Sequence, residues 1–364
     1  MARKQSLAGQ QRGTIITLEH TSRILEGNLL NDPVVRSVAV YLPANYDRTN
    51  KRRYTVLYDL AGFTGAGPAH LNWKNFDENL AEQLDRLIST GKLAPLIVVF
   101  PDCFTALGGN QYINSSAIGR YADYLTRELI PFVDAEFRTH ATREHRGCFG
   151  KSSGGYGAMI HAMRYPQFWG AIANHSGDAY FDFVYRAEWP RTLTHLQNFK
   201  QPRLAPGQRK AQKAQQNPGY DDGRVQRFLN AFWADRNPTQ ADVMTIMMLA
   251  MAASYDADKH APNGFRLPFD LDTGELLPRR WQTWLRHDPI ELVSKYKANL
   301  KTLKGIYIDC GWRDQFHIHY GSRQLSRLLH QQGIQHRYEE FDDNHSAIDY
   351  RMDVSLPYLA RRLS

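Results

Sequence analysis

A serine flanked by glycines is the residue of this chain best suited to chemistry. The segment Gly150-Lys151-Ser152-Ser153-Gly154 follows an expected apolar strand and precedes an expected helix. A G-x-S-x-G pattern between a strand and a helix predicts a sharp turn that exposes the serine hydroxyl. Glycines lack Cβ atoms, so they let the chain bend tightly on both sides of that turn. Ser152 is therefore the candidate nucleophile, and a plain structural turn is the alternative.

A serine nucleophile needs a histidine to take its proton and an acid to orient that histidine. His345 lies in the loop after the last expected strand and is the candidate base. Asp314 follows the preceding strand and is preferred to Asp309 as the acid, because Asp309 closes that strand and could be a buried hydrogen-bonding residue. Asp342 and Asp343 lie too close to His345 in sequence to orient its far ring nitrogen easily.

Two further histidines, His317 and His319, form an H-x-H pattern that could suggest a metal site. No acidic or cysteine ligand set accompanies them, so we interpret them as ordinary loop or helix-start residues. Neither a metal nor an organic cofactor is expected.

Acyl transfer also needs backbone N–H groups aimed at the developing oxyanion. One donor is expected from Ser153, the residue after the candidate nucleophile, and the other from the loop after an early strand. Residues 61–67 form such a glycine-rich loop, in which Phe63 is the candidate donor. The alternatives are a plain glycine-rich turn and a phosphate cradle, but neither of the two common phosphate-binding glycine motifs occurs there.

These motifs resemble the esterase family of α/β-hydrolases that includes esterase D (S-formylglutathione hydrolase), enterochelin-type esterases, feruloyl esterases and mycolyltransferases. The resemblance covers residues 36–177 and 306–351. It implies that Ser152 is the nucleophile, Asp314 the acid and His345 the base. It also implies that Phe63 and Ser153 supply the two oxyanion donors. Two positions depart from the pattern: Ala61 stands where many members have histidine, and Lys151 precedes the nucleophile.

The elements that must position these residues alternate along the chain. Strands are expected over 14–17, 38–42, 55–60, 96–100, 146–149, 171–174, 306–309 and 337–341. Helices are expected over 77–89, 120–133, 154–164, 322–332 and 349–361. This alternation predicts an α/β fold with a mostly parallel central sheet covered by helices on both faces, and the resemblance implies the α/β-hydrolase fold.

The alternation stops after residue 177. Between residues 178 and 300 helices are expected over 223–234, 240–253, 278–286 and 290–299. We therefore expect residues 1–177 and 301–364 to form the hydrolase core, and residues 178–300 to form a mainly helical cap or lid insertion. Four methionines within 244–251 could line an acyl pocket or pack the cap onto the core.

A polar and aromatic loop follows the fourth expected strand, at the edge of the sheet where the candidate nucleophile lies. Loops at that edge often carry function. Gln111, Tyr112 and Asn114 are therefore the candidate substrate-binding residues.

Composition limits the classes of partner. The net charge is +8, and part of the excess lies in the interrupted basic stretch Arg186, Arg191, Lys200, Arg203, Arg209, Lys210 and Lys213. That stretch has no nucleic-acid-binding motif and is interpreted as a solvated segment, so no nucleic-acid partner is expected. No run approaches the ~18 apolar residues of a membrane span. The first residues show no signal peptide, and three scattered cysteines suit a reducing compartment, which together favour a cytoplasmic location.

The expected function is that of a serine carboxylesterase, which hydrolyses small-to-medium carboxylic esters, aromatic ones included, through a Ser-His-Asp triad and an acyl-enzyme. An acyltransferase with the same triad and a non-catalytic binding protein on a hydrolase fold are the alternatives. The expected partner is a small-molecule ester, and assembly into a homo-oligomer is left open.

Overall fold

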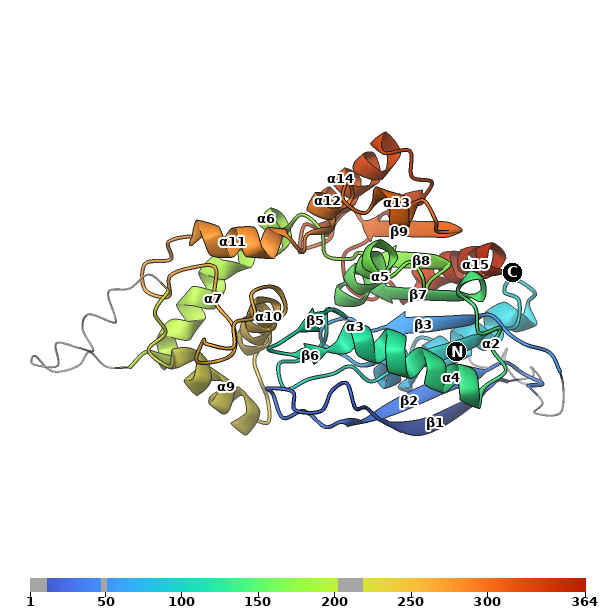
Figure 1. Ribbon diagram of the computed structural model, residues 1–364, viewed down its shortest axis with the longest axis horizontal. Coiled ribbons are helices and arrows are strands. Elements are labelled where there is room, and N and C mark those ends of the chain that lie inside the picture. Colours follow the sequence, from blue (N-terminus) through green and yellow to red (C-terminus); the bar gives the residue numbers. More distant parts are fainter. Residues whose placement is uncertain (1–11, 47–50, 202–218) are drawn as a thin grey trace, which may run out of the picture.

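One eight-stranded sheet runs through the molecule (Figure 1). The computed structural model describes residues 12–46, 51–201 and 219–364. The strands are β1 (Thr14–Thr21), β2 (Val35–Leu42), β3 (Val56–Leu60), β4 (Ile97–Pro101), β7 (Arg146–Lys151), β8 (Ala171–His175), β9 (Gly305–Gly311) and β10 (Arg337–Phe341). All eight expected strands are thus present, and only their ends differ.

The strand order is β1-β2-β4-β3-β7-β8-β9-β10. Strand β2 is antiparallel to both of its neighbours, and every other adjacent pair is parallel. The carboxyl ends of β3, β7, β8, β9 and β10 therefore meet at one edge of the sheet. This is the mostly parallel sheet of the α/β-hydrolase fold, as expected.

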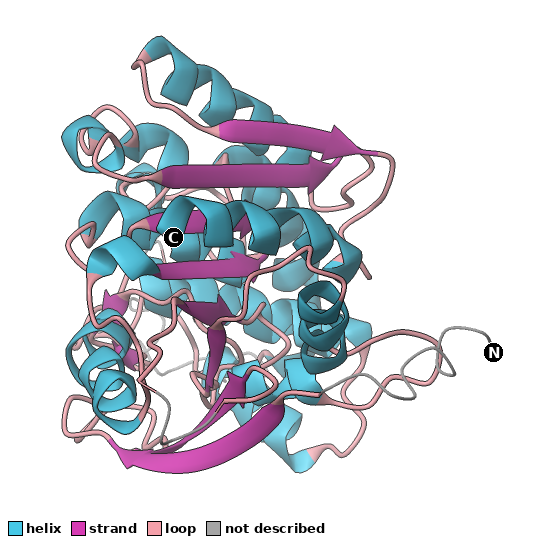
Figure 2. Cartoon of the chain, turned by 90° about the vertical axis from the view of Figure 1, so that its right-hand side faces the viewer, coloured by secondary structure: helices cyan, strands magenta, loops and turns pink. Residues whose placement is uncertain are grey.

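Helices cover both faces of the sheet, as Figure 2 shows. The helices between and after the strands are α2 (Leu80–Ser89), α3 (Tyr121–Asp123), α4 (Ile130–Glu136), α5 (Ser153–Arg164), α14 (Ile318–Gln331) and α15 (Met352–Leu363). Strand β4 shows why two layers form, because its side chains alternate between two hydrophobic clusters. Val98 and Phe100 pack with α2 and α15 on one face, and Ile97 and Val99 pack in the larger cluster that includes α5.

The segment between β8 and β9 is helical, as expected. It contains α6 (Phe181–Val184), α7 (Trp189–Leu196), α9 (Arg224–Ala234), α10 (Gln240–Tyr255), α11 (Pro278–Leu285), α12 (Pro289–Leu292) and α13 (Lys297–Leu300). Helices α7, α9, α10 and α11 lie together at the left of Figure 1. Helices α12 and α13 instead contact α5 of the core. The cap boundary at residue 300 stays a prediction.

Two expectations for this segment were wrong. The single helix expected over 290–299 is two short helices, because Val293 and Ser294, which are weak helix formers, stand between them. Helix α7 was not expected within the basic stretch, although Trp189, Thr192 and Leu196 all face inward at helical spacing.

The basic stretch is partly neutralised where it is described. Arg186 pairs with Asp182, Arg191 lies 3.9 Å from Glu188, and Lys200 lies 2.7 Å from Asp272. The remaining four cations of the stretch lie outside the described residues: Arg203, Arg209, Lys210 and Lys213.

Three cysteines, Cys103, Cys148 and Cys310, are free thiols buried in the larger hydrophobic cluster. Burial raises the pKa of each thiol. Among the helices of the described residues, none combines the length and apolar character needed to cross a bilayer.

Candidate active site

Ser152 lies in the tight turn between β7 and α5. Its backbone has φ 58° and ψ −123°, a conformation that non-glycine residues rarely adopt. A Cβ atom at Gly154 would lie 1.7 Å from the backbone oxygen of Leu60, and one at Gly150 would lie 2.3 Å from the same oxygen. Both glycines are therefore required by the close approach of β3. Strained backbone held by its surroundings is common at functional sites.

His345 and Asp314 lie in neighbouring loops, after β10 and β9 respectively, and are joined by a hydrogen bond. His345 Nδ1 is 2.7 Å from Asp314 Oδ2, and only 2% of Asp314 is exposed. The other carboxylate oxygen of Asp314 accepts a hydrogen bond from the backbone N–H of Phe316, and the ring of Phe316 packs edge-on against His345. The carboxylate therefore fixes the ring through Nδ1, which leaves Nε2 for proton exchange.

The structure thus brings the predicted base and acid together. Among the described residues, no hydrogen bond joins Ser152 to His345. Catalytic hydrogen bonds are often long in the absence of substrate, so this geometry does not reject the pair. The contact between Ser152 and His345 stays a prediction.

The loop that carries Phe63 lies against the Ser152 turn. A Cβ atom at Gly62 would lie 3.6 Å from the Cβ atom of Ser152. The backbone of Phe63 is held from the other side, because the Gly109 N–H donates a hydrogen bond of 2.7 Å to its carbonyl oxygen. Ser153 opens α5, where backbone N–H groups have no partner within the helix. The two predicted oxyanion donors therefore lie on adjoining segments.

The predicted substrate-binding residues have local partners. Gln111 Nε2 donates to Ser153 Oγ over 2.7 Å, and the side-chain oxygen Oε1 of Gln111 is buried without a hydrogen-bond partner. The Tyr112 hydroxyl donates to the carbonyl oxygen of Ala61 over 2.7 Å. Asn114 is exposed and accepts from the backbone N–H of Asp123. Gln111 and Tyr112 thus support the turn and the Phe63 loop, and contact of these three residues with substrate stays a prediction.

A second serine, histidine and aspartate are joined by hydrogen bonds, but all three are buried. His175 Nδ1 lies 2.7 Å from Asp309 Oδ1, and His175 Nε2 lies 2.8 Å from Ser355 Oγ. The exposed fraction is 1% for His175 and 0% for both Asp309 and Ser355. A substrate cannot reach them, so this chain of contacts is structural. It supports the preference for Asp314 over Asp309 as the acid.

This buried network adjoins the Ser152 turn. The Ser152 N–H donates to the carbonyl oxygen of His175 over 3.0 Å. Asp309 also accepts from Arg351 Nε over 2.9 Å and from the Tyr307 hydroxyl over 3.0 Å. Burial alone would raise the pKa of Asp309, but His175 and Arg351 outweigh it and hold that pKa below its usual range.

Three more titratable groups surround the turn. Burial raises the pKa of Asp178 to about 6, against the hydrogen bond from the Tyr185 hydroxyl and the charge of His345, which lower it. Burial lowers the pKa of Lys151. The Asp59 carboxylate raises the pKa of His70, with which it forms an ion pair. Sequence reasoning missed Asp178, although its place just after β8 puts it at the edge where the site was sought.

Within the described part of the chain, no group of three or more histidine, cysteine or acidic side chains could hold a metal ion. His317 stands at the residue before α14 with φ 62° and makes no side-chain capping hydrogen bond, and His319 is buried in the first turn of that helix. Both histidines thus occupy the helix start that the sequence indicated.

This chain matches one protein family over most of its length and several curated proteins over part of it. Residues 34–355 match the family described as "Putative esterase". An esterase of Mycobacterium tuberculosis is 34% identical over 148 residues, which are 39% of this chain and 29% of that protein. An endo-1,4-beta-xylanase/feruloyl esterase of Xylanibacter ruminicola is 30% identical over 154 residues, which are 40% of this chain and 20% of that protein. The match therefore spans less than a third of either relative.

Solved structures are similar over nearly the full length. A ferulic acid esterase has a TM-score of 0.58 at 17% identity, with 97% of this chain and 99% of that chain covered. An S-formylglutathione hydrolase from Agrobacterium tumefaciens has a TM-score of 0.55 at 18% identity, with 97% of each chain covered. At such identities the likeness establishes the shared α/β-hydrolase fold alone. Because the family match covers most of the chain, this protein belongs to the "Putative esterase" family.

Proposed function

We propose that this protein hydrolyses carboxylic esters through an acyl-enzyme on Ser152. The observation that carries the proposal is the buried hydrogen bond between His345 and Asp314, at the sheet edge where the strained Ser152 turn also lies. An imidazole fixed by a carboxylate through Nδ1 can take a proton at Nε2 and return it later. The family relationship supports the same chemistry.

In the proposed mechanism His345 takes the proton of Ser152 Oγ as that oxygen attacks the ester carbonyl carbon. The oxyanion that forms accepts hydrogen bonds from the backbone N–H groups of Phe63 and Ser153, each worth about 3–4 kcal/mol in the transition state. The carbon–oxygen bond to the alcohol then breaks, and His345 protonates the leaving oxygen. Water, activated by His345 in turn, attacks the acyl-enzyme and releases the acid.

Small-to-medium esters, aromatic ones included, are the proposed substrates. Two of the similar proteins are described as a feruloyl esterase and a ferulic acid esterase, and a third as an S-formylglutathione hydrolase. A panel of p-nitrophenyl esters of increasing acyl length, with methyl ferulate added, would rank these classes by kcat/KM. An added alcohol that diverts most of the acyl group from water would favour an acyltransferase instead.

We further propose that residues 178–300 act as a cap over this site. Met251 of α10 places its sulfur 3.0 Å from Gln111 Nε2, and the Ser115 hydroxyl donates to the carbonyl oxygen of Ala253 over 2.5 Å. Helix α10 therefore contacts the loop that supports Ser153. Met251→Ala should change the preferred acyl length in the ester panel, whereas an unchanged ranking would argue against an acyl pocket at α10.

The nucleophile can be tested directly with a fluorophosphonate, which reacts with activated serines. We expect a single adduct by intact mass, located on Ser152 by peptide mapping and absent from Ser152→Ala. Ser355→Ala is the matched control, because Ser355 is hydrogen-bonded to a histidine but is fully buried. Labelling that persists in folded Ser152→Ala would reject the proposed nucleophile.

A further inference from the structure

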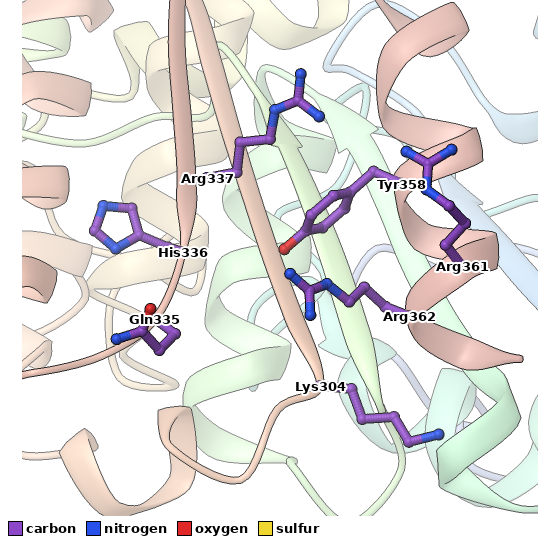
Figure 3. Close-up of a pocket in the computed structure, with 7 residues that line it drawn as sticks. All are labelled: Lys304, Gln335, His336, Arg337, Tyr358, Arg361 and Arg362. Carbon is purple, nitrogen blue, oxygen red and sulfur yellow. The ribbon is translucent and has the colours of Figure 1, made fainter.

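A basic hollow of about 500 Å³ lies at the edge of the sheet opposite the Ser152 turn (Figure 3). Its walls come from the starts of β9 and β10 and from the last turn of α15. The residues that line it are Lys304, Gln335, His336, Arg337, Tyr358, Arg361 and Arg362. Four of these seven side chains carry a permanent positive charge and none carries a negative charge.

Two of the guanidinium groups are held in place by tyrosine rings. Arg337 lies 5.6 Å from the ring centre of Tyr307, and Arg362 lies 5.3 Å from that of Tyr358. The two rings are themselves 5.7 Å apart. Figure 3 shows Tyr358 and Arg362 extending together from α15 toward the start of β9. Stacking orders a guanidinium before any ligand arrives, which lowers the entropy cost of binding.

The backbone of β9 makes room for this arrangement. A Cβ atom at Gly305 would lie 2.8 Å from Arg362 Cγ and 3.1 Å from Tyr358 Cε1. Both side chains therefore pack directly over the bare Cα of Gly305. Glycine at the first position of β9 is thus part of how the hollow is built.

The positive charges are largely uncompensated. Within the described residues, Arg337 forms an ion pair with Glu339, but no carboxylate lies within 4.0 Å of Lys304, Arg361 or Arg362. Lys304 instead donates to the backbone oxygen of Glu144 over 3.2 Å. The C-terminal end of a helix favours cations, which accounts for Arg361 and Arg362. It does not account for Lys304, just before β9, or for Arg337, at the start of β10.

We propose that this hollow binds a small anion with two or more negative charges, of the pyrophosphate or polyphosphate-ester class. Planar guanidinium groups match phosphate oxygens in pairs, and the hollow is large enough for such a molecule. Three unpaired cations favour a multiply charged ligand over a single carboxylate. A single local hollow of this volume suits a small molecule better than a nucleic-acid strand, which follows an extended track of charges. This site is independent of the proposed esterase function.

Calorimetric titration of the full chain with inorganic pyrophosphate at low salt tests the proposal. We expect saturable one-site binding, weakened at least tenfold in Arg361→Gln/Arg362→Gln and in Lys304→Gln/Arg362→Gln. The matched control is Lys259→Gln/Arg279→Gln, which removes two exposed charges elsewhere. The Tm measured by circular dichroism should be unchanged in all three variants, which would show that each is folded.

Three results would overturn the proposal. The first is no saturable binding by the wild-type chain. The second is an equal loss of affinity in the Lys259→Gln/Arg279→Gln control, which would indicate attraction by net charge only. The third is tighter binding of single-stranded DNA or of anionic vesicles than of pyrophosphate, abolished by the same hollow variants, which would assign the surface to a macromolecule or a membrane.

Discussion

Two aspartates near the end of β9, Asp309 and Asp314, should separate catalysis from stability. Asp314→Asn keeps the size of the side chain but removes the charge opposite His345 Nδ1, which lies 2.7 Å away. The same change in the triad of a serine protease lowers kcat by about 10⁴, through loss of the correct tautomer. We expect a decrease of about 10³–10⁴ in kcat, equivalent to about 4–5.5 kcal/mol of transition-state stabilisation.

Asp309→Asn should act on the fold instead. Its carboxylate is fully buried and lies 2.7 Å from His175 and 2.9 Å from Arg351. Removal of one partner of a buried ion pair costs about 3–5 kcal/mol. At about 2.1 cal/mol/K per residue, the unfolding entropy of a chain this long converts that loss into a Tm lower by about 4–7 °C.

The stability lost in Asp309→Asn should depend on pH. Because the pKa of Asp309 is held below its usual range, its contribution to stability is complete above about pH 4. That contribution is lost as the pH falls through the folded-state pKa. The difference in stability between wild type and Asp309→Asn should therefore narrow on acidification.

The assay pairs kcat measurements on p-nitrophenyl acetate with thermal unfolding followed by circular dichroism, for both variants. Asp342→Asn, at an exposed loop position, is the control for charge removal. The reasoning is refuted if Asp309→Asn loses turnover at an unchanged Tm while Asp314→Asn retains it, because the acid would then be the wrong aspartate.

Three other changes probe the surroundings of the site. Gly154→Ala places a Cβ atom 1.7 Å from the backbone oxygen of Leu60. Such overpacking should lower the free energy of unfolding, measured in urea, by about 1–3 kcal/mol or more. Burial lowers the pKa of His161 to about 4. Between pH 6.5 and pH 4 this histidine is therefore protonated in the unfolded chain but neutral in the folded chain. Stability should therefore fall by about 2 kcal/mol from pH 7 to pH 5 through this group, and urea unfolding of His161→Gln at both pH values should show a smaller fall. Tyr112→Phe leaves the carbonyl oxygen of Ala61 without its donor and should cost about 1–3 kcal/mol, with kcat reduced more than KM is raised.

The sequence predicted those features that depend on local pattern. Apolar runs bounded by turn residues located every strand of the large sheet, and the glycine spacing located the turn at Ser152. Chain order, together with the positions of Asp314 and His345 in loops after two strands, selected the histidine and aspartate that are hydrogen-bonded. Such features are encoded within about ten neighbouring residues, or in the order of a few motifs.

Features that depend on distant partners could not be predicted. The buried contacts of His175 reach Asp309, 134 residues away, and Ser355, 180 residues away, and nothing local marks them. The hydrogen bond from Gln111 to Ser153 likewise depends on how two loops meet. Helix α7 was missed because the stretch was interpreted from its scattered cations, and the helical spacing of Trp189, Thr192 and Leu196 was overlooked.

The three buried cysteines make it possible to measure how often the hydrophobic core is transiently exposed to solvent. Cys103, Cys148 and Cys310 share one hydrophobic cluster, so an alkylating reagent can reach them only when that cluster separates. The rate at which iodoacetamide modifies native protein would then report how often the interior is transiently exposed. Alkylation of all three thiols at one common rate would mean that the larger cluster opens as a single cooperative unit.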